Sequence, residues 1–378
     1  MPASPGPAFP GSASPGPSGD IVETAGAASG ADKPPLLVLD RVRAFLDEHG
    51  LGAGEVRARR IGEGGGSNFT FLLERDEGRF VLRRPPRPPL PPSAHDVVRE
   101  ARLQLALREA GFARLPTIVA VCEDESVLGV PFYVMTYLDG YVPTDELPPG
   151  LESEPARRRL GDDLVDSLVE IHGADVASPG LAAFARPGSY NERQLRRFTQ
   201  LWGINKTREI PRVEQVGGWL ADNVPAPLPE TVVHGDFRLG NTMVTPGVGP
   251  DEPSRIAAVL DWEMGAIGDP RADVGYLLAT YSEPGGPPNP LGTSPVTALP
   301  GFPGRAELVE RYVARSGRDV EPLPWFEALA LWKAAVFCEA IYGRFVRGEL
   351  GAEDESAARF EQGVPYLADA AAEAIARG

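Results

Sequence analysis

A short polar loop between two apolar segments carries the side chains best suited to chemistry in this chain. The loop holds Asp236 and Asn241 and follows the apolar run 231–233. Downstream, Asp261 comes directly after a second apolar run, 256–260. Carboxylate and amide oxygens suit Mg²⁺, which also binds the oxygens of substrate phosphates. We therefore expect Asn241 and Asp261 to hold Mg²⁺ and Asp236 to accept a hydroxyl proton during phosphoryl transfer.

A second candidate is the glycine-rich turn GEGGGSN at 62–68, which lies between two predicted strands. Glycine lets a backbone approach phosphates closely and point its N–H groups at them. The same composition also suits a flexible hairpin tip, so both interpretations stay open. A strand rather than a helix follows the turn, which excludes a dinucleotide-binding fingerprint. No Gly-Lys pair occurs in the chain, which excludes the phosphate-binding loop of nucleoside triphosphatases.

The elements that would position these groups form two lobes after an N-terminal tail. Residues 1–35 are rich in Pro, Gly, Ser and Ala, and we predict that they are disordered because they offer little apolar surface. Residues 36–138 are expected to form an antiparallel sheet with one inserted helix, with strands at 55–61, 69–74, 79–84, 118–122 and 131–138. Residues 139–378 are mainly helical around short strands at 231–233, 242–244 and 256–260. The predicted fold class is α+β.

Composition excludes several kinds of partner. The formal net charge of the 378 residues is −16. Protein surfaces that bind nucleic acid are basic, so we expect no nucleic-acid partner. No run of 18 apolar residues occurs, and we expect no membrane partner. Cys122 and Cys338 do not make a disulfide scaffold, and no secretory pattern is recognisable, so the expected compartment is the cytoplasm. The sequence leaves the oligomeric state open.

Several motifs occur in an order that points to one family. HGDFRLGN at 234–241 is followed by LDWE at 260–263 and GDPRAD at 268–273. RFVLRRPP at 79–86 and PFYVMTYLDG at 131–140 precede them. Together they resemble the aminoglycoside phosphotransferase and choline kinase family, and most closely a subfamily related to kinase-like domains fused to acyl-CoA dehydrogenases. The resemblance implies a bilobal protein-kinase-like fold with a small antiparallel-sheet N-lobe (36–138), a larger mainly helical C-lobe (139–378) and ATP between them.

The resemblance also implies roles for the matching residues of the second lobe. Asp236 would be the catalytic base, and Asn241 and Asp261 would be the magnesium ligands. Arg238 is open to two interpretations. It would either stabilise the phosphoryl group in transfer, or be a loop arginine paired with a carboxylate. His234 and Asp273 are expected to support the loop rather than to react.

The first lobe would bind the nucleotide. Arg83 takes the place of the lysine that contacts the α- and β-phosphates in protein kinases, and Glu100 would pair with it. Met135 and Tyr137, in the connector between the lobes, would carry the adenine. The triphosphate would be covered by the glycine-rich turn, through Gly64, Gly65, Gly66, Ser67 and Asn68.

These features predict an ATP- and Mg²⁺-dependent kinase that phosphorylates a hydroxyl of a small molecule. The sequence leaves the phosphate acceptor open among a hydroxylated metabolite, a hydroxyacyl compound and an aminoglycoside. An anionic acceptor would favour basic residues, and the candidates are Lys333, Arg344 and Arg347, although a solvated helix face would look the same. A catalytically silent nucleotide-binding regulator is the main alternative. A protein kinase is disfavoured because the Gly-Asp-Pro stretch at 268–270 follows Asp261 too closely to leave room for a long activation segment.

Overall fold

The computed structural model describes residues 19–29, 33–62, 68–90, 95–247, 253–286, 288–349 and 354–377, and for 354–356 it describes the backbone only. The chain forms two compact units. The N-terminal unit comprises the described residues up to Arg102 together with Pro116–Leu138. The C-terminal unit comprises Leu103–Leu115 and the described residues from Asp139 onward.

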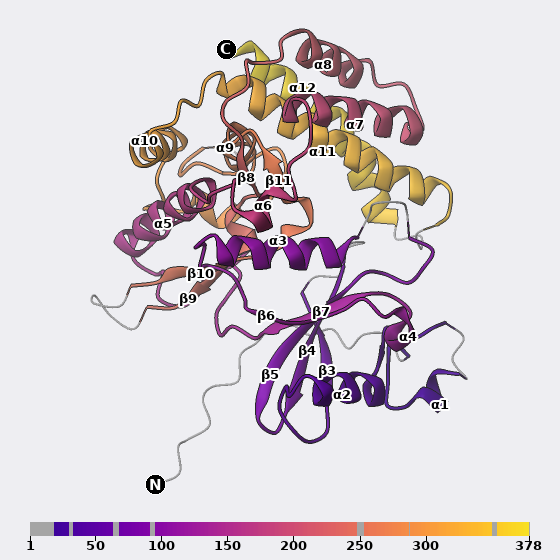
Figure 1. Cartoon of the computed structure of the whole chain (residues 1–378). Coiled ribbons are helices and arrows are strands. Elements are labelled where there is room, and N and C mark those ends of the chain that lie inside the picture. Colours follow the sequence, from indigo (N-terminus) through magenta and orange to yellow (C-terminus); the bar gives the residue numbers. More distant parts are fainter. Residues whose placement is uncertain are drawn as a thin grey trace. The chain divides into compact units, whose positions relative to one another are not determined.

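The N-terminal unit is built on a five-stranded antiparallel sheet in the order β3-β4-β5-β7-β6 (Figure 1). Its strands are β3 (Arg57–Ile61), β4 (Phe69–Arg75), β5 (Gly78–Arg84), β6 (Ile118–Cys122) and β7 (Phe132–Thr136). The predicted strands are therefore confirmed, because period-2 apolar patterns and tight turns are reliable strand signals. Helix α2 (Leu39–Glu48) and short helix α4 (Glu125–Leu128) pack against this unit's core through side chains such as Phe45 and Leu128.

Part of the segment predicted as a disordered tail is ordered in the structure. Strand β1 (Ile21–Val22) pairs in parallel with β2 (Leu37–Val38), and helix α1 (Ala25–Ala28) follows β1. The Oδ2 of Asp40 accepts a hydrogen bond from the N–H of Ala25 at 2.9 Å. Composition hides this because Ile21 and Val22 lie among polar and small residues, yet both pack on the apolar core. Residues 1–18 and 30–32 lie outside the described part of the chain.

Helix α3 (Val97–Glu109) contributes to both units. Its first turns pack Val97 and Ala101 against Tyr133 of β7. Its later residues, Leu103 and Leu107, belong to the core of the C-terminal unit. The sequence predicts the whole helix as part of the first lobe. Periodicity locates a helix, but it does not show against which of two hydrophobic cores each of its turns packs.

The C-terminal unit is mainly helical. Helix α11 (Leu323–Val346) is apolar around most of its circumference and is largely buried, as expected of a central helix. It packs against α7, α8, α9 and α12, and Figure 1 shows α12 running alongside it. Besides the later part of α3, the α-helices of the unit among the described residues are α5 (Glu154–His172), α6 (Pro179–Ala182), α7 (Tyr190–Asn205), α8 (Pro211–Asp222), α9 (Arg271–Ala279), α10 (Arg305–Ser316), α11 and α12 (Asp354–Ala376).

Two short antiparallel strand pairs position the polar loop that was singled out from the sequence. Strand β8 (Thr231–Val233) pairs with β11 (Ala266–Gly268), and β9 (Thr242–Thr245) pairs with β10 (Arg255–Val259). Thr242 lies opposite Val259, so the residues just before β9 and just after β10 are neighbours. This register brings Asn241 and Asp261 to the same end of the pair. Within the described residues, no helix is long and apolar enough to cross a membrane.

Candidate active site

Asp236 and Asn241 are joined across the loop that connects β8 to β9. The side-chain amide of Asn241 donates hydrogen bonds to the backbone oxygen and to Oδ2 of Asp236, both at 2.8 Å. Its Nδ2 is thereby committed to Asp236, and its Oδ1 is the side-chain atom that could bind a metal ion. A short 3-10 turn, Leu239–Asn241, makes this approach possible across five positions of sequence.

The second carboxylate oxygen of Asp236 has the properties of a proton acceptor. Its Oδ1 is buried and accepts no hydrogen bond from any described residue. A buried polar oxygen without a donor is costly unless a ligand supplies the donor. The Nε of Arg238 lies 3.6 Å from this oxygen, which is an ion pair but too long for a hydrogen bond. This ion pair is compatible with both interpretations of Arg238, and its role toward phosphate remains a prediction.

Tyr276 is a neighbour of Asp236 that sequence reasoning missed. Burial raises the pKa of Tyr276 well above 10, and the negative charge of the neighbouring Asp236 raises it further. The phenol is thus held neutral beside the carboxylate. The residue lies on α9, forty positions after Asp236, and no local pattern in the sequence marks it.

Asp261 lies at the end of β10 in an unusual backbone conformation. Its φ is +65°, in the left-handed region that non-glycine residues rarely adopt. The backbone oxygen of Asn241 accepts a hydrogen bond from Leu260 at 2.8 Å, which ties the two segments together. The charge of Asp261 also contributes to the raised pKa of Tyr276. Asp236, Asn241 and Asp261 therefore lie in one part of the structure, and the side-chain oxygens of Asn241 and Asp261 are of the kind that magnesium takes together with water and phosphate ligands.

A buried carboxylate, Asp273 at the start of α9, binds the backbone of the loop between β8 and β9. It accepts backbone N–H groups of His234 at 2.6 Å and of Gly235 at 2.8 Å. His172 lies 3.2 Å from the same carboxylate and 2.7 Å from the hydroxyl of Tyr312. Burial alone would raise the pKa of Asp273, but the hydrogen bond and electrostatic contribution of His172, followed by the electrostatic contribution and backbone N–H of His234, bring it below its ordinary value. The contacts fit the predicted supporting role of Asp273.

His234 is completely buried and both of its ring nitrogens are engaged. Its Nε2 lies 2.8 Å from the backbone oxygen of Leu260, and its Nδ1 lies 3.2 Å from the backbone nitrogen of Asp236. A neutral imidazole satisfies both contacts, with Nε2–H donating and Nδ1 accepting. The ring therefore supports the loop and is not placed as a base.

The N-terminal unit contains the ion pair that the resemblance implied. The Nε of Arg83 on β5 lies 3.1 Å from Oε2 of Glu100 on α3. The other oxygen of Glu100 accepts a hydrogen bond from the hydroxyl of Tyr133 at 3.2 Å. Glu100 is only 1% exposed, so its charge is stabilised by these donors and not by water.

Three other residues expected to bind the nucleotide lie in the described part of the N-terminal unit. Asn68 is buried, and its Oδ1 lies 3.2 Å from a ring nitrogen of His95. Met135 is half-buried on β7. Tyr137 follows that strand, and the guanidinium of Arg79 lies 4.4 Å from its ring centroid. Four further candidates lie outside the described residues, namely Gly64, Gly65, Gly66 and Ser67.

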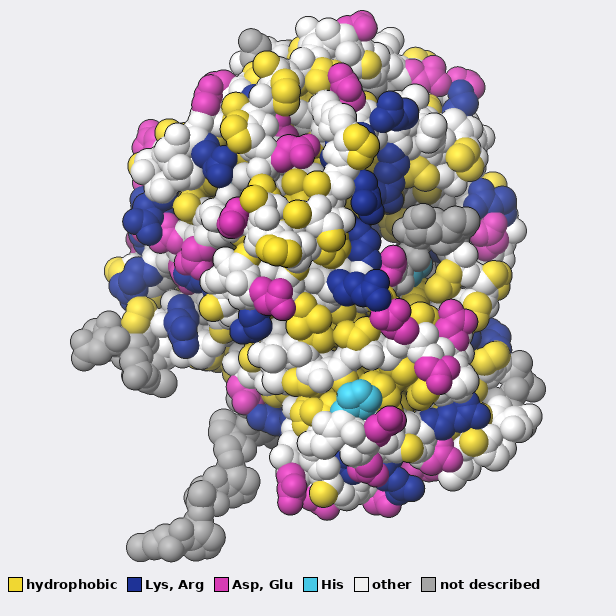
Figure 2. Space-filling model, in the orientation of Figure 1, with side chains coloured by type: hydrophobic (Ala, Val, Ile, Leu, Met, Phe, Trp, Pro, Cys, Tyr) yellow, Lys and Arg dark blue, Asp and Glu magenta, His cyan; other side chains and the backbone are white. Residues whose placement is uncertain are grey.

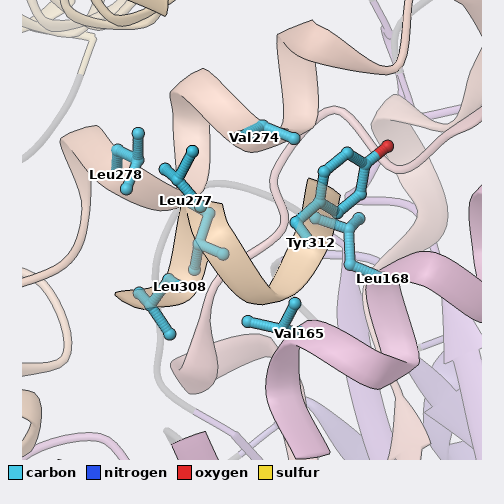
Figure 3. A pocket seen from close by; sticks show the side chains of 8 residues that line it. Val165, Leu168, Val274, Leu277, Leu278, Leu308 and Tyr312 are labelled. Atoms are coloured by element: carbon cyan, nitrogen blue, oxygen red, sulfur yellow. The ribbon is translucent and has the colours of Figure 1, made fainter. Parts of the chain in front are cut away.

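A small apolar cavity lies elsewhere in the C-terminal unit. Figure 3 shows its lining side chains, with the Tyr312 hydroxyl pointing away from Leu277, Leu278 and Leu308. Helices α5, α9 and α10 supply the walls, and that hydroxyl is already bonded to His172. An aliphatic lining of this kind offers nothing to a phosphate, so we assign the cavity to imperfect packing.

Comparison with known proteins agrees with this arrangement. Residues 58–330 match the phosphotransferase enzyme family. The chain is 35% identical over 312 residues to mouse acyl-CoA dehydrogenase family member 10, covering 82% of this chain and 28% of that protein. It is 32% identical over 320 residues to rat acyl-CoA dehydrogenase family member 11, covering 83% and 40%. The chain thus spans well under half the length of these curated relatives.

Solved structures show the same fold. A Ralstonia eutropha protein classed as an aminoglycoside phosphotransferase superposes with a TM-score of 0.68 at 26% identity, over 88% of this chain and 98% of that one. Spectinomycin phosphotransferase, solved with ADP and spectinomycin, superposes with a TM-score of 0.56 at 12% identity, over 88% and 98%, and supports the fold alone. The predicted α+β kinase-like fold is therefore confirmed, and the chain belongs to the phosphotransferase enzyme family.

Proposed function

We propose that this chain transfers the γ-phosphate of ATP to a hydroxyl group of a small molecule, with Asp236 as the base. The observation that carries the proposal is the buried Oδ1 of Asp236, which has no hydrogen-bond donor while Asn241 fixes the other oxygen. A substrate hydroxyl is the donor that this oxygen lacks. Family membership supports the reaction class.

In the proposed reaction, the acceptor hydroxyl donates to Oδ1 of Asp236 as its oxygen attacks the γ-phosphorus. The bond between the acceptor oxygen and phosphorus forms, the bond from phosphorus to the bridging oxygen of ADP breaks, and the proton passes to Asp236. Arg238, 3.6 Å from Oδ1, would help to stabilise the charge on the transferred group.

Asn241 and Asp261 would hold the magnesium ion. When bound, Mg²⁺ supplies charge neutralisation and orientation of the phosphate oxygens. Asn241 is suited to this because its amide nitrogen is occupied by Asp236, which directs its oxygen elsewhere. The left-handed backbone of Asp261 is a strained conformation of the kind that persists at functional sites.

The N-terminal unit would hold the nucleotide. Arg83 has its Nε bonded to Glu100, so the guanidinium is oriented before a phosphate arrives. We also assign the triphosphate to the turn of Gly64, Gly65, Gly66, Ser67 and Asn68. The connector residues Met135 and Tyr137 would carry the adenine. The cytoplasmic location stays a prediction from the sequence.

The first test is Mg²⁺-dependent ATP consumption by the full chain against a mixed panel of acceptors. The panel includes aminoglycosides, choline, sugars, amino alcohols, macrolides and hydroxyacyl compounds. Wild type should consume ATP with one of these classes, and Asp236→Asn should reduce turnover by about 10²–10⁴-fold because the base is lost. Asp222→Asn, an exposed change on α8, should leave turnover unchanged.

The outcomes separate the proposal from its alternatives. Turnover that survives Asp236→Asn would overturn the assignment of the base. If no acceptor is consumed while ATP and Mg²⁺ still raise the melting temperature, a nucleotide-binding regulator would replace the enzyme. The intact set of Asp236, Asn241 and Asp261 favours the enzyme.

A further inference from the structure

Lys333 is an ammonium group in an otherwise apolar setting. It lies on the central helix α11 and is 9% exposed. Burial of a charge is costly unless a counter-charge or hydrogen bonds accompany it. Among the described residues, no side chain or backbone group forms a hydrogen bond or ion pair with Lys333. Its Nζ instead lies 4.9 Å from the ring centroid of Phe198, a cation–π contact.

A second cation approaches the same ring. Arg197 on α7 is exposed, and its Cζ lies 5.9 Å from the Phe198 centroid. Within the described part of the chain it too has neither an ion pair nor a hydrogen bond. By contrast, Arg193 and Arg208 at the two ends of this region are paired with Glu230 and Glu339. Within the described residues, no carboxylate pairs with either of the two cations that contact the Phe198 ring.

The electrostatics of Lys333 reflect this setting. Burial and then the charge of Arg197 lower its pKa to about 8, while Asp273 and Asp236 partly oppose the shift. The ammonium is still mostly protonated at neutral pH, and no carboxylate of the described residues forms an ion pair with it. An anion that entered here would supply that charge to both basic groups.

The position of this pair relates it to Asp236. Helix α11 packs on α7 and α9. Tyr276 of α9 lies beside Asp236 and also packs against the apolar cluster that contains Phe198 and Trp332. The charge of Asp236 acts on Lys333, as noted above. The cationic pair is therefore near the proposed base and belongs to the same unit of the chain.

We propose, on the basis of the phosphotransferase function proposed above, that Lys333 and Arg197 form an anion subsite for the phosphate acceptor. A carboxylate or phosphate of the acceptor would lie between the ammonium and the guanidinium, while its hydroxyl is directed to Asp236. The subsite selects anionic alcohols and repels polycations such as aminoglycosides. Of the other basic candidates from the sequence, Arg344 and Arg347 are exposed and pair with Glu349, so they form a solvated face.

The kinetic test compares acceptor alcohols in matched pairs. Each pair has a hydroxy acid and the diol of the same carbon skeleton, and a phosphorylated alcohol forms a third arm. For wild type, kcat/KM for the anionic member should exceed that of the diol by at least about tenfold. Lys333→Met and Arg197→Gln should bring this ratio near one, mainly by raising KM for the acid. Arg197 is exposed, so we expect Arg197→Gln to test the subsite with little effect on the stability of the fold.

A binding test uses the small number of lysines in the chain. Lysine occurs only at 33, 206 and 333, so lysine labelled with ¹³C and ¹⁵N gives three side-chain signals, and Lys333→Met identifies one of them. Inorganic phosphate and a short hydroxy acid should move the Lys333 signal and raise its titration midpoint above about 8. The Lys206 signal is the internal control, because Lys206 is already paired with Glu209 and Glu214.

The two tests distinguish failure of the subsite from failure of the activity. Turnover without preference for the anionic member, together with an unmoved Lys333 signal, would overturn the subsite and leave phosphotransfer intact. A Lys333 signal that responds to anions while no acceptor is phosphorylated would support the subsite and overturn the activity. If Mg²⁺-ATP shifts the Lys333 signal as much as the hydroxy acid does, Lys333 and Arg197 would bind the nucleotide, which would overturn the acceptor subsite.

Discussion

At the scale of single residues, the site consists of a few groups whose neighbours determine their chemistry. Asn241 occupies one oxygen of Asp236, and the other oxygen is buried without a donor. Arg238 faces that oxygen at 3.6 Å and is 24% exposed at its side chain. If Asp236 is the base as proposed, a cation at this place would lie next to the reacting atoms, and its main effect should be on the transition state.

Replacement of Arg238 tests this assignment. We expect Arg238→Ala to lower kcat by about 10–10³-fold with little change in KM for ATP, because charge that develops during transfer loses its partner. Arg238→Lys should recover part of the loss, since it keeps the charge but not the planar fork. Steady-state kinetics at saturating acceptor measure both quantities. Unchanged turnover in Arg238→Ala would show that the arginine is only a loop residue.

At the scale of elements, the loop between β8 and β9 depends on a tight backbone turn at Gly235. This residue has φ of +83°, and a Cβ there would lie 2.9 Å from the backbone oxygen and from the Cβ of Met264. Its N–H is bound by Asp273. Only glycine has both the conformational freedom and the absence of a side chain that this packing needs.

Substitution of this glycine should therefore affect stability and activity together. We expect Gly235→Ala to reduce the free energy of unfolding by about 1–3 kcal/mol from backbone strain alone, with additional loss from the contact with Met264. The matched control is Gly218→Ala in α8, which meets no atom within 4 Å and should stabilise the helix by about 0.5–1 kcal/mol. Thermal denaturation and turnover measure the effects. A melting temperature of Gly235→Ala equal to that of wild type would refute the packing argument.

At the scale of the whole molecule, the proposed functions are divided between the two compact units. The pair Arg83–Glu100 belongs to the N-terminal unit, whereas Asp236, Asn241 and Asp261 belong to the C-terminal unit. The chain is strongly acidic at −16, and Figure 2 shows acidic and basic side chains interspersed over the face drawn. The unpaired cations at Phe198 are therefore a local feature and do not reflect an excess of positive charge.

Ligand binding should stabilise the whole molecule by mass action. ATP with Mg²⁺ at about 100 times its Kd should add about 2.7 kcal/mol, which is roughly 3–4 °C in melting temperature for a chain of this length that unfolds as one unit. Removal of Mg²⁺ with a chelator should reduce the shift, and Asp261→Asn should abolish the Mg²⁺-dependent part only. Asp222→Asn is the control. An Mg²⁺-dependent shift that persists in Asp261→Asn would exclude that carboxylate as a ligand.

The sequence by itself determined the strands of the N-terminal unit, the order of the motifs and the family. These features depend on local patterns: alternation along β4 and β5, the turn between them, and the short spacing from Asp236 to Asn241. Such patterns act over a few residues, because a strand or a loop is shaped mainly by its own neighbours in the chain. The expected pairing of Arg83 with Glu100 came from the family resemblance and not from any local pattern.

Only the tertiary structure decided which distant groups meet at the site. Tyr276 reaches Asp236, and Asp273 is joined to His172 across 101 positions. Lys333 meets Phe198 because α11 packs on α7, and residues 19–29 are ordered because a distant core accepts Ile21. Contacts of this kind depend on how helices and strands pack in three dimensions, and a single sequence carries no local signal for them.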